Sequence, residues 1–232
     1  MSNYAETQAQ VVEICQKLVG KGFLAGTGGN VSARVPGEPA LAITPSNFDY
    51  MKMQPTDICV LGLDLKVIEG GMKPSIESSL HAAIYANRPD AAVVIHTHQI
   101  YASAFALINQ PIPALYDEQV RFLGRSVEIV PYAPSGTGLL KKSLAARLRN
   151  HCNAYILQNH GAVCLGDSAE RAIFNVELLE KVALTYLLAL CTEKKVTRIP
   201  LPVREIAFNR LRQDEKKAEQ LLKEPMGVKV DD

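Results

Sequence analysis

The stretch AAVVIHTH, residues 91–98, places two histidines at the end of an apolar run that is typical of a buried β-strand. In a strand, residues i and i+2 point to the same face, so the imidazoles of His96 and His98 would be neighbours. A core strand favours apolar side chains, and a surface strand does not need two histidines on one face. The pair therefore indicates a ligand site at the point where the strand stops.

A third histidine, His160, lies in LQNHGAV, residues 157–163, where the pattern predicts a strand, a tight turn at 159–161 and a returning strand. Three neutral imidazoles that converge at strand ends would suit Zn²⁺ and leave one or two coordination positions open for a substrate. A structural zinc site is closed and usually recruits cysteine, so an open site favours catalysis. The alternative is that each histidine satisfies only a local hydrogen bond.

The composition is that of an ordinary globular protein. The chain has 232 residues, 47% of them hydrophobic and 21% charged, with a formal net charge of +1, which gives no support for nucleic acid or an anionic membrane as partner. The five cysteines are scattered without a CxxC pair, so we expect reduced thiols in a cytoplasmic protein. The N-terminus lacks the apolar stretch of a signal peptide, and no run approaches the roughly 18 apolar residues that cross a bilayer.

Short strands alternate with helical patterns along most of the chain, which favours an α/β or α+β protein. We interpret residues 1–232 as a single domain, with a polar C-terminal helix or tail from about 203. The predicted helices are 5–22, 75–88, 99–107, 138–150 and 168–191. The predicted strands are a short one after the glycines at 26–29, then 40–45, 57–64 with a hairpin partner at 65–68, 91–98, 126–133 and the hairpin 154–166.

Two further stretches carry polar groups of interest. Glu77 precedes His81 by one helical turn in KPSIESSLHAAI, residues 73–84, and is either a charge that complements the helix dipole or a general base aimed into a pocket. His81 alone is more typical of a structural partner than of a metal ligand. The glycine-rich stretch GTGGNVS, residues 26–32, could cradle a phosphate, although no GK[ST] follows it and by itself it predicts only a turn.

Four stretches together, GTGGNVSAR, ITPSN, KPSIESSLHAAIYANRPDAAVVIHTH and LQNHGAV, resemble the class II aldolase/adducin-head family in order and spacing, over roughly residues 5–190. The resemblance implies a three-layer α/β/α fold with a mainly antiparallel central sheet, and a homotetramer with active sites at subunit interfaces. By the same resemblance, three histidines bind Zn²⁺ (or Mn²⁺ or Co²⁺), Glu77 is the acid/base, and five residues hold a substrate phosphate. The implied metal ligands are His96, His98 and His160, and the implied phosphate residues are Thr27, Gly28, Asn30, Ser46 and Ser75.

The chain also departs from the family pattern. Ile76 stands where family aldolases often have a second serine before the glutamate, and Asn47 stands where a glycine is common. After PIPAL, where family aldolases often carry an active-site tyrosine, this chain has YDEQV. Tyr116, Asp117 and Glu118 are therefore the candidates for a second proton donor, and the alternative is a solvated loop.

The resemblance implies a metal-dependent aldolase that reversibly cleaves a ketose 1-phosphate to dihydroxyacetone phosphate and an aldehyde. A deoxy- or methylthio-pentulose 1-phosphate is one candidate substrate, because Ile76 indicates a less polar aldehyde end. A pentulose-phosphate 4-epimerase or an oxo-acid-phosphate decarboxylase could use the same site. A non-catalytic adducin-like interaction module is the alternative from another class, and the presence of all three histidines and Glu77 argues against it.

Overall fold

A computed structural model describes residues 4–223, which form an eight-stranded sheet covered by helices. The strand order is β4-β3-β2-β1-β5-β8-β7-β6, and every neighbouring pair is antiparallel except β6 and β7. The expectation of a mainly antiparallel sheet is confirmed. The strands are β1 Asn30–Arg34, β2 Ala40–Ile43, β3 Cys59–Gly62, β4 Val67–Glu69, β5 Val93–Thr97, β6 Glu128–Val130, β7 Ala154–Leu157 and β8 Gly161–Gly166.

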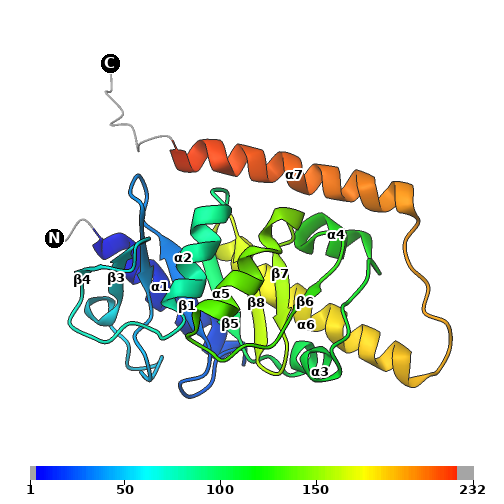
Figure 1. Cartoon of the computed structure of the whole chain (residues 1–232), viewed down its shortest axis with the longest axis horizontal. Helices are drawn as coiled ribbons and strands as arrows, with labels where there is room; N and C mark the ends of the chain where they lie inside the picture. The colour runs from blue at the N-terminus through cyan, green and yellow to red at the C-terminus, as the bar shows by residue number, and fades with distance from the viewer. Residues whose placement is uncertain (1–3, 224–232) are drawn as a thin grey trace.

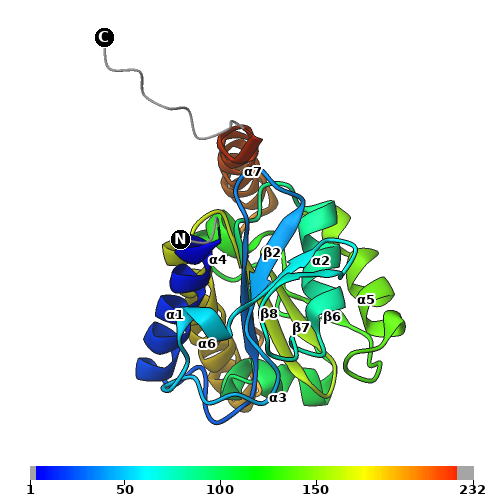
Figure 2. The ribbon, with the colours of Figure 1, turned by 90° about the vertical axis from the view of Figure 1, so that its left-hand side faces the viewer.

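Helices cover both faces of this sheet. Figure 2 shows α1 and α6 on one face and α2 and α5 on the other, which makes three layers. The helices are α1 Ala5–Gly20, α2 Ser78–Asn87, α3 Ile100–Ile108, α4 Asp117–Leu123, α5 Gly138–Ala145, α6 Ala169–Cys191 and α7 Leu201–Lys223, with short 3₁₀ turns at Pro55–Asp57 and Leu148–Asn150. The α/β/α architecture predicted from the sequence is therefore confirmed.

Strand β5 lies at the centre of the sheet and is buried on both faces. Ile95 joins the apolar cluster under α1 and α6, whereas Val94 joins the cluster under α2 and α5. A strand covered on both sides needs apolar residues at consecutive positions, which explains the uninterrupted run before His96. His96 shares the face of Val94, so its imidazole lies on the side of the sheet that α2 covers.

Two glycines let the neighbouring strands approach β5 closely. Gly29 has φ of +82°, and a Cβ there would lie 2.5 Å from the carbonyl oxygen of His96. A Cβ on Gly161 would lie 2.4 Å from the carbonyl oxygen of Thr97. Any larger residue at either position would push β1 or β8 away from the end of β5.

Most predicted elements are confirmed within a few residues, with three differences. The helix predicted over 138–150 ends at Ala145, and only a 3₁₀ turn at Leu148–Asn150 follows it. Helix α2 begins at Ser78 rather than 75, because Ser75 forms a turn in which its hydroxyl accepts the N–H of Glu77 at 3.2 Å. Helix α4 was not predicted. It is only seven residues long, with two acidic residues in its first turn and Val120 and Leu123 buried, so its apolar pattern is too short to stand out.

The polar C-terminal helix α7 lies across the top of the molecule in Figure 1, next to α4. Phe208 and Leu211 of α7 pack with Val120 of α4 in a small apolar cluster. Glu215, 5% exposed, contacts the fully buried Arg88 after α2 at 2.8 Å. Within residues 4–223, no helix combines the length and the apolar composition that crossing a bilayer requires.

Arg88 joins several parts of the chain. Its guanidinium also donates to both carboxylate oxygens of Asp90, to the carbonyl of Cys152 and to the side chain of Asn153. These bonds compensate for removing the cation from water.

We expect Arg88→Ala to lower the free energy of unfolding by about 3–5 kcal/mol, because Asp90 and Glu215 would remain buried without their cation. Urea denaturation measures this loss. The control is Lys17→Ala, which removes an exposed i,i+4 pair with Glu13 and should leave the midpoint almost unchanged. Equal midpoints for the two variants would contradict a stabilising role for the Arg88 cluster.

Candidate metal centre and active site

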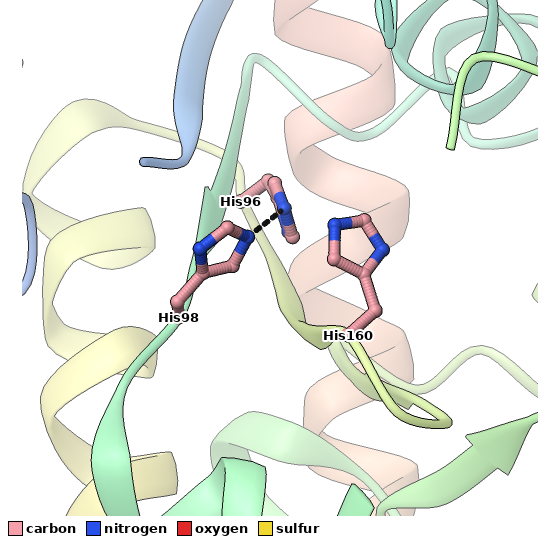
Figure 3. A group of neighbouring side chains, drawn as sticks. All are labelled: His96, His98 and His160. Carbon is pink, nitrogen blue, oxygen red and sulfur yellow. Dashed lines mark hydrogen bonds between the residues drawn. The ribbon is translucent and has the colours of Figure 1, made fainter. Parts of the chain in front are cut away.

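The three histidines predicted from the sequence meet at one end of the central strands. His96 and His98 lie at the end of β5, and His160 directly precedes β8, which pairs with β5. Their candidate ligand atoms all lie within 4.8 Å of one another. Figure 3 shows the three rings gathered around one point. In a tetrahedral zinc site with Zn–N bonds of about 2.0–2.1 Å, ligand nitrogens are roughly 3.3 Å apart. The 3.1 Å between the Nε2 atoms of His96 and His98 is close to that spacing.

The imidazole of His96 is held in an orientation that suits metal binding. Its Nδ1 lies 2.9 Å from the carbonyl oxygen of Ala162, so Nδ1–H donates and Nε2 presents its lone pair to the cluster. Burial lowers the pKa of His96 to about 4, and burial together with the nearby His160 lowers the pKa of His98. Both rings are therefore neutral at neutral pH, the state in which imidazole binds a metal ion.

Glu77 provides the negative charge of the cluster. Its Oε2 lies 3.3 Å from Nε2 of His96, and its Oε1 lies 3.5 Å from Nε2 of His160. Burial favours a higher pKa for Glu77, but the nearby His96 and a hydrogen bond from Asn30 outweigh it and hold the pKa below its usual value. The side chain is thus a carboxylate at neutral pH.

Two buried atoms of this cluster have no hydrogen-bond partner among residues 4–223, namely Oε1 of Glu77 and Nδ1 of His160. Unpartnered polar atoms are costly inside a protein, and they are expected where a ligand or ion completes the site. Three imidazoles beside one carboxylate are also a suitable donor set for a divalent transition metal. The residues present therefore fit a metal ion.

The cluster lies in a cleft of about 200 Å³. The five residues expected to hold phosphate all line this cleft, and so do Glu77 and the three histidines. An antiparallel bridge between Pro45 and Pro74 joins the two serine-bearing segments, with the N–H of Ser46 donating to the carbonyl of Lys73 and the N–H of Ser75 to that of Thr44. Asn47 has a left-handed backbone with φ of 55°, which explains why asparagine can replace the expected glycine. The cleft residues are Thr27, Gly28, Gly29, Asn30, Pro45, Ser46, Asn47, Ser75, Ile76, Glu77, His96, His98, Ser135 and His160.

Asn30 contacts protein groups that the sequence did not connect to it. Its Nδ2 donates to Oε2 of Glu77 at 2.7 Å, and its Oδ1 lies 2.5 Å from Nε2 of His81. Asn30 is only 5% exposed, and its side-chain amide contacts Glu77 and His81 rather than solvent. His81 has the structural role that its sequence context indicated.

The sequence and the fold were compared with known proteins. Residues 9–187 match the family model for the class II aldolase and adducin N-terminal domain. This chain belongs to the class II aldolase/adducin family. An L-fuculose phosphate aldolase of Escherichia coli O6:H1 (strain CFT073) is 34% identical over 181 residues, which are 78% of this chain and 82% of that protein.

Two other class II aldolase/adducin relatives are informative. A 5-deoxy-D-ribulose 1-phosphate aldolase of Bacillus thuringiensis serovar kurstaki is 32% identical over 177 residues, 76% of this chain and 82% of that protein. The solved structure of an L-fuculose 1-phosphate aldolase superposes with a TM-score of 0.84 at 29% identity, covering 89% of this chain and 96% of that one. The similarity therefore extends over most of the sheet and its helices.

Three residues considered as second proton donors lie outside the cleft of their own chain. Tyr116 lines a separate hollow with Tyr186, Asp117 begins α4, and Glu118 pairs with Lys181 of α6 at 3.3 Å. These residues could reach a class II aldolase/adducin site only from another copy of the chain. That arrangement stays a prediction.

Ser135 lines the cleft and was not singled out from the sequence. Its hydroxyl lies 3.4 Å from Nε2 of His160, on a turn that follows β6. Gly136 has φ of +73°, which lets this turn approach the backbone of Ile76. The PSGTG stretch after a predicted strand is a turn signal, but only the fold shows that the turn reaches the histidines.

We expect His98→Ala to lose the metal ion, because two imidazoles leave the site without a full ligand set. Metal analysis should give about one divalent ion per wild-type chain and a background level for the variant. His151→Asn is the control, since His151 contacts Arg212 away from the cleft and its left-handed backbone tolerates asparagine. A metal-free wild-type protein that takes up no Zn²⁺, Mn²⁺ or Co²⁺ would contradict the assignment.

Proposed function

We propose that this protein is a metal-dependent aldolase that reversibly cleaves a ketose 1-phosphate to dihydroxyacetone phosphate and an aldehyde. The observation that carries the proposal is the position of Glu77, whose carboxylate lies within 3.5 Å of two of three clustered histidines in a cleft lined by hydroxyl groups. The names of the relatives, which are aldolases of sugar 1-phosphates, support the same substrate class.

His96, His98 and His160 would hold the metal ion. We favour Zn²⁺ because three imidazoles suit it, with Mn²⁺ or Co²⁺ as substitutes. When bound, the ion supplies a Lewis acid that stabilises the negative charge developing on the substrate oxygens as the carbon–carbon bond breaks.

Glu77 is the acid/base in this proposal. Its carboxylate is 5% exposed, so it is shielded from bulk water, and its lowered pKa leaves it deprotonated at neutral pH, the form that can accept a proton. It moves the proton on the carbon of dihydroxyacetone phosphate that forms the new bond. The N–H of Asn30 orients the oxygen Oε2, and no donor in the described part of the chain reaches Oε1.

The substrate phosphate would bind among Thr27, Ser46, Ser75 and the backbone of Gly28, which all line the cleft. Because the hydroxyl oxygen of Ser75 accepts the N–H of Glu77, its hydrogen is free to donate to an anion. These three segments therefore offer hydroxyl and backbone N–H donors to the phosphate. None of the residues that line the cleft is a lysine or an arginine.

The other substrate end would face Ile76 and Ser135. Ile76 is 57% exposed although it is large and apolar, so it presents an apolar surface at the cleft. This surface favours an aldehyde with an apolar terminus, such as one from a deoxy- or methylthio-pentulose 1-phosphate. The proposal includes the homotetramer implied by the family, in which Tyr116, Asp117 or Glu118 of one copy would serve the cleft of another.

We expect Glu77→Gln to retain metal, fold and substrate affinity but to lose exchange of the dihydroxyacetone phosphate proton with deuterated solvent. Glutamine has almost the same size but cannot accept the proton, and a positioned carboxylate contributes about 10²–10⁴-fold. NMR of the substrate in D₂O measures this step without an aldehyde.

The matched control is Glu180→Gln on α6, a carboxylate that accepts backbone N–H groups of α3 rather than facing the cleft. Exchange at the wild-type rate in Glu77→Gln would show that a residue other than Glu77 is the base. Wild-type protein that neither exchanges this proton nor condenses dihydroxyacetone phosphate with any member of an aldehyde panel would refute the proposed function.

We expect Thr27→Val to raise KM for the phosphorylated substrate about tenfold or more with little change in kcat. A hydrogen bond to a charged group contributes about 1.5–3 kcal/mol, and phosphate binding is similar in the ground and transition states. Thr185→Val on α6, outside the cleft, is the matched control. Equal turnover of the unphosphorylated sugar by wild-type protein would contradict a phosphate site.

A further inference from the structure

A chain of buried hydrogen bonds leads from Glu77 away from the cleft, into the layer between the sheet and α2. Asn30 Nδ2 lies 2.7 Å from Glu77, and Asn30 Oδ1 lies 2.5 Å from Nε2 of His81. Nδ1 of His81 lies 2.6 Å from the hydroxyl of Ser32, which is 2.9 Å from the hydroxyl of Tyr85. All five residues are at most 5% exposed, so protein groups rather than water decide the direction of each bond.

The direction of each bond follows from the one before it. A carboxylate only accepts hydrogen bonds, so Asn30 must present its NH₂ group to Glu77 and its carbonyl to His81. Nε2 of His81 must then carry the hydrogen, and Nδ1 must be the acceptor. The hydroxyl of Ser32 therefore donates to Nδ1, and the hydroxyl of Tyr85 donates either to that hydroxyl oxygen or to the backbone carbonyl of Ser32, each 2.9 Å away.

The imidazole of His81 carries a hydrogen on only one of its two nitrogens. It is fully buried, and burial lowers its pKa to about 3, so the ring stays neutral and carries a single hydrogen. Asparagine, in contrast, can turn its amide by 180° without changing shape. In the turned state Asn30 would direct its carbonyl oxygen at the carboxylate of Glu77, and the two oxygens would repel each other.

We propose that His81, as the Nε2–H tautomer whose Nδ1 accepts the Ser32 hydroxyl, is a positioning residue that holds the Asn30 amide with its N–H toward Glu77. This role rests on the proposed function, in which Glu77 moves the substrate proton. His81 does not touch the cleft, so it acts on the reaction only through Asn30. The metal ligands are not part of this chain of hydrogen bonds.

Two substitutions separate positioning from packing. His81→Leu fills most of the space but offers no N–H to Asn30, and we expect kcat for proton exchange to fall about 10–100-fold, as for other residues that orient a catalytic group, with KM within about twofold. His81→Gln can place an amide N–H near the position of Nε2, and we expect it to keep most of the wild-type kcat. His151→Asn is the control for a histidine outside the site and should leave kcat and KM unchanged.

A second measurement does not depend on activity. ¹⁵N NMR of histidine-labelled wild-type protein, with the His81 signals assigned by their loss in His81→Gln, should show a protonated Nε2 and an unprotonated Nδ1. Thermal unfolding of each variant is recorded alongside, and kinetics are measured well below the unfolding midpoints.

The outcomes separate the two proposals. A protonated Nδ1 in wild-type protein would overturn the positioning role whether or not the protein is an aldolase. A wild-type kcat in folded His81→Leu, or equal losses in His81→Leu and His81→Gln that follow their stabilities, would also overturn it. If wild-type protein shows no exchange at all, the proposed aldolase function is wrong, and so is the proposal that His81 helps to position a catalytic base.

Discussion

The pairing of β5 with β1 on one side and β8 on the other is the constraint on which the site depends. In this register Asn30 lies opposite His96, and Thr97 lies opposite Ala162, two residues after His160. Residues from three distant parts of the sequence thereby meet at one end of the sheet. Gly29 and Gly161 are required for this close approach, because a side chain on either would collide with the backbone of β5.

The site combines features that are individually costly in a protein interior. Glu77 is buried beside neutral imidazoles, and one of its oxygens has no partner within the described chain. A divalent cation at the histidines would provide the missing charge, and the Asn30 amide already satisfies the other oxygen. Because Asn30 donates only to Oε2, Oε1 has no hydrogen-bond donor within the described chain. A free oxygen suits a group that must accept and release a proton.

The second half of the sheet and the C-terminal helix stabilise this arrangement from a distance. Arg88, at the end of α2, connects the helix that follows Glu77 to Asn153 before β7 and to Glu215 on α7. The long helix α7 is polar in sequence, yet Phe208 and Leu211 pack against α4 and Glu215 is buried. A charged residue on a polar helix can thus be part of the protein interior when a buried cation lies opposite.

The sequence alone predicted most helices and strands and singled out the three histidines and Glu77, because apolar periodicity and residue spacing are local properties of the chain. The three-layer architecture was implied by the resemblance of the sequence to a known family. That resemblance also led to Thr27, Ser46 and Ser75, all of which line the cleft. Tertiary structure alone placed Ser135 beside His160, kept Tyr116 and Glu118 away from the cleft of their own chain, and connected Asn30 to His81. Those contacts depend on strand register and on side-chain interactions between residues up to 63 positions apart, which no local pattern records.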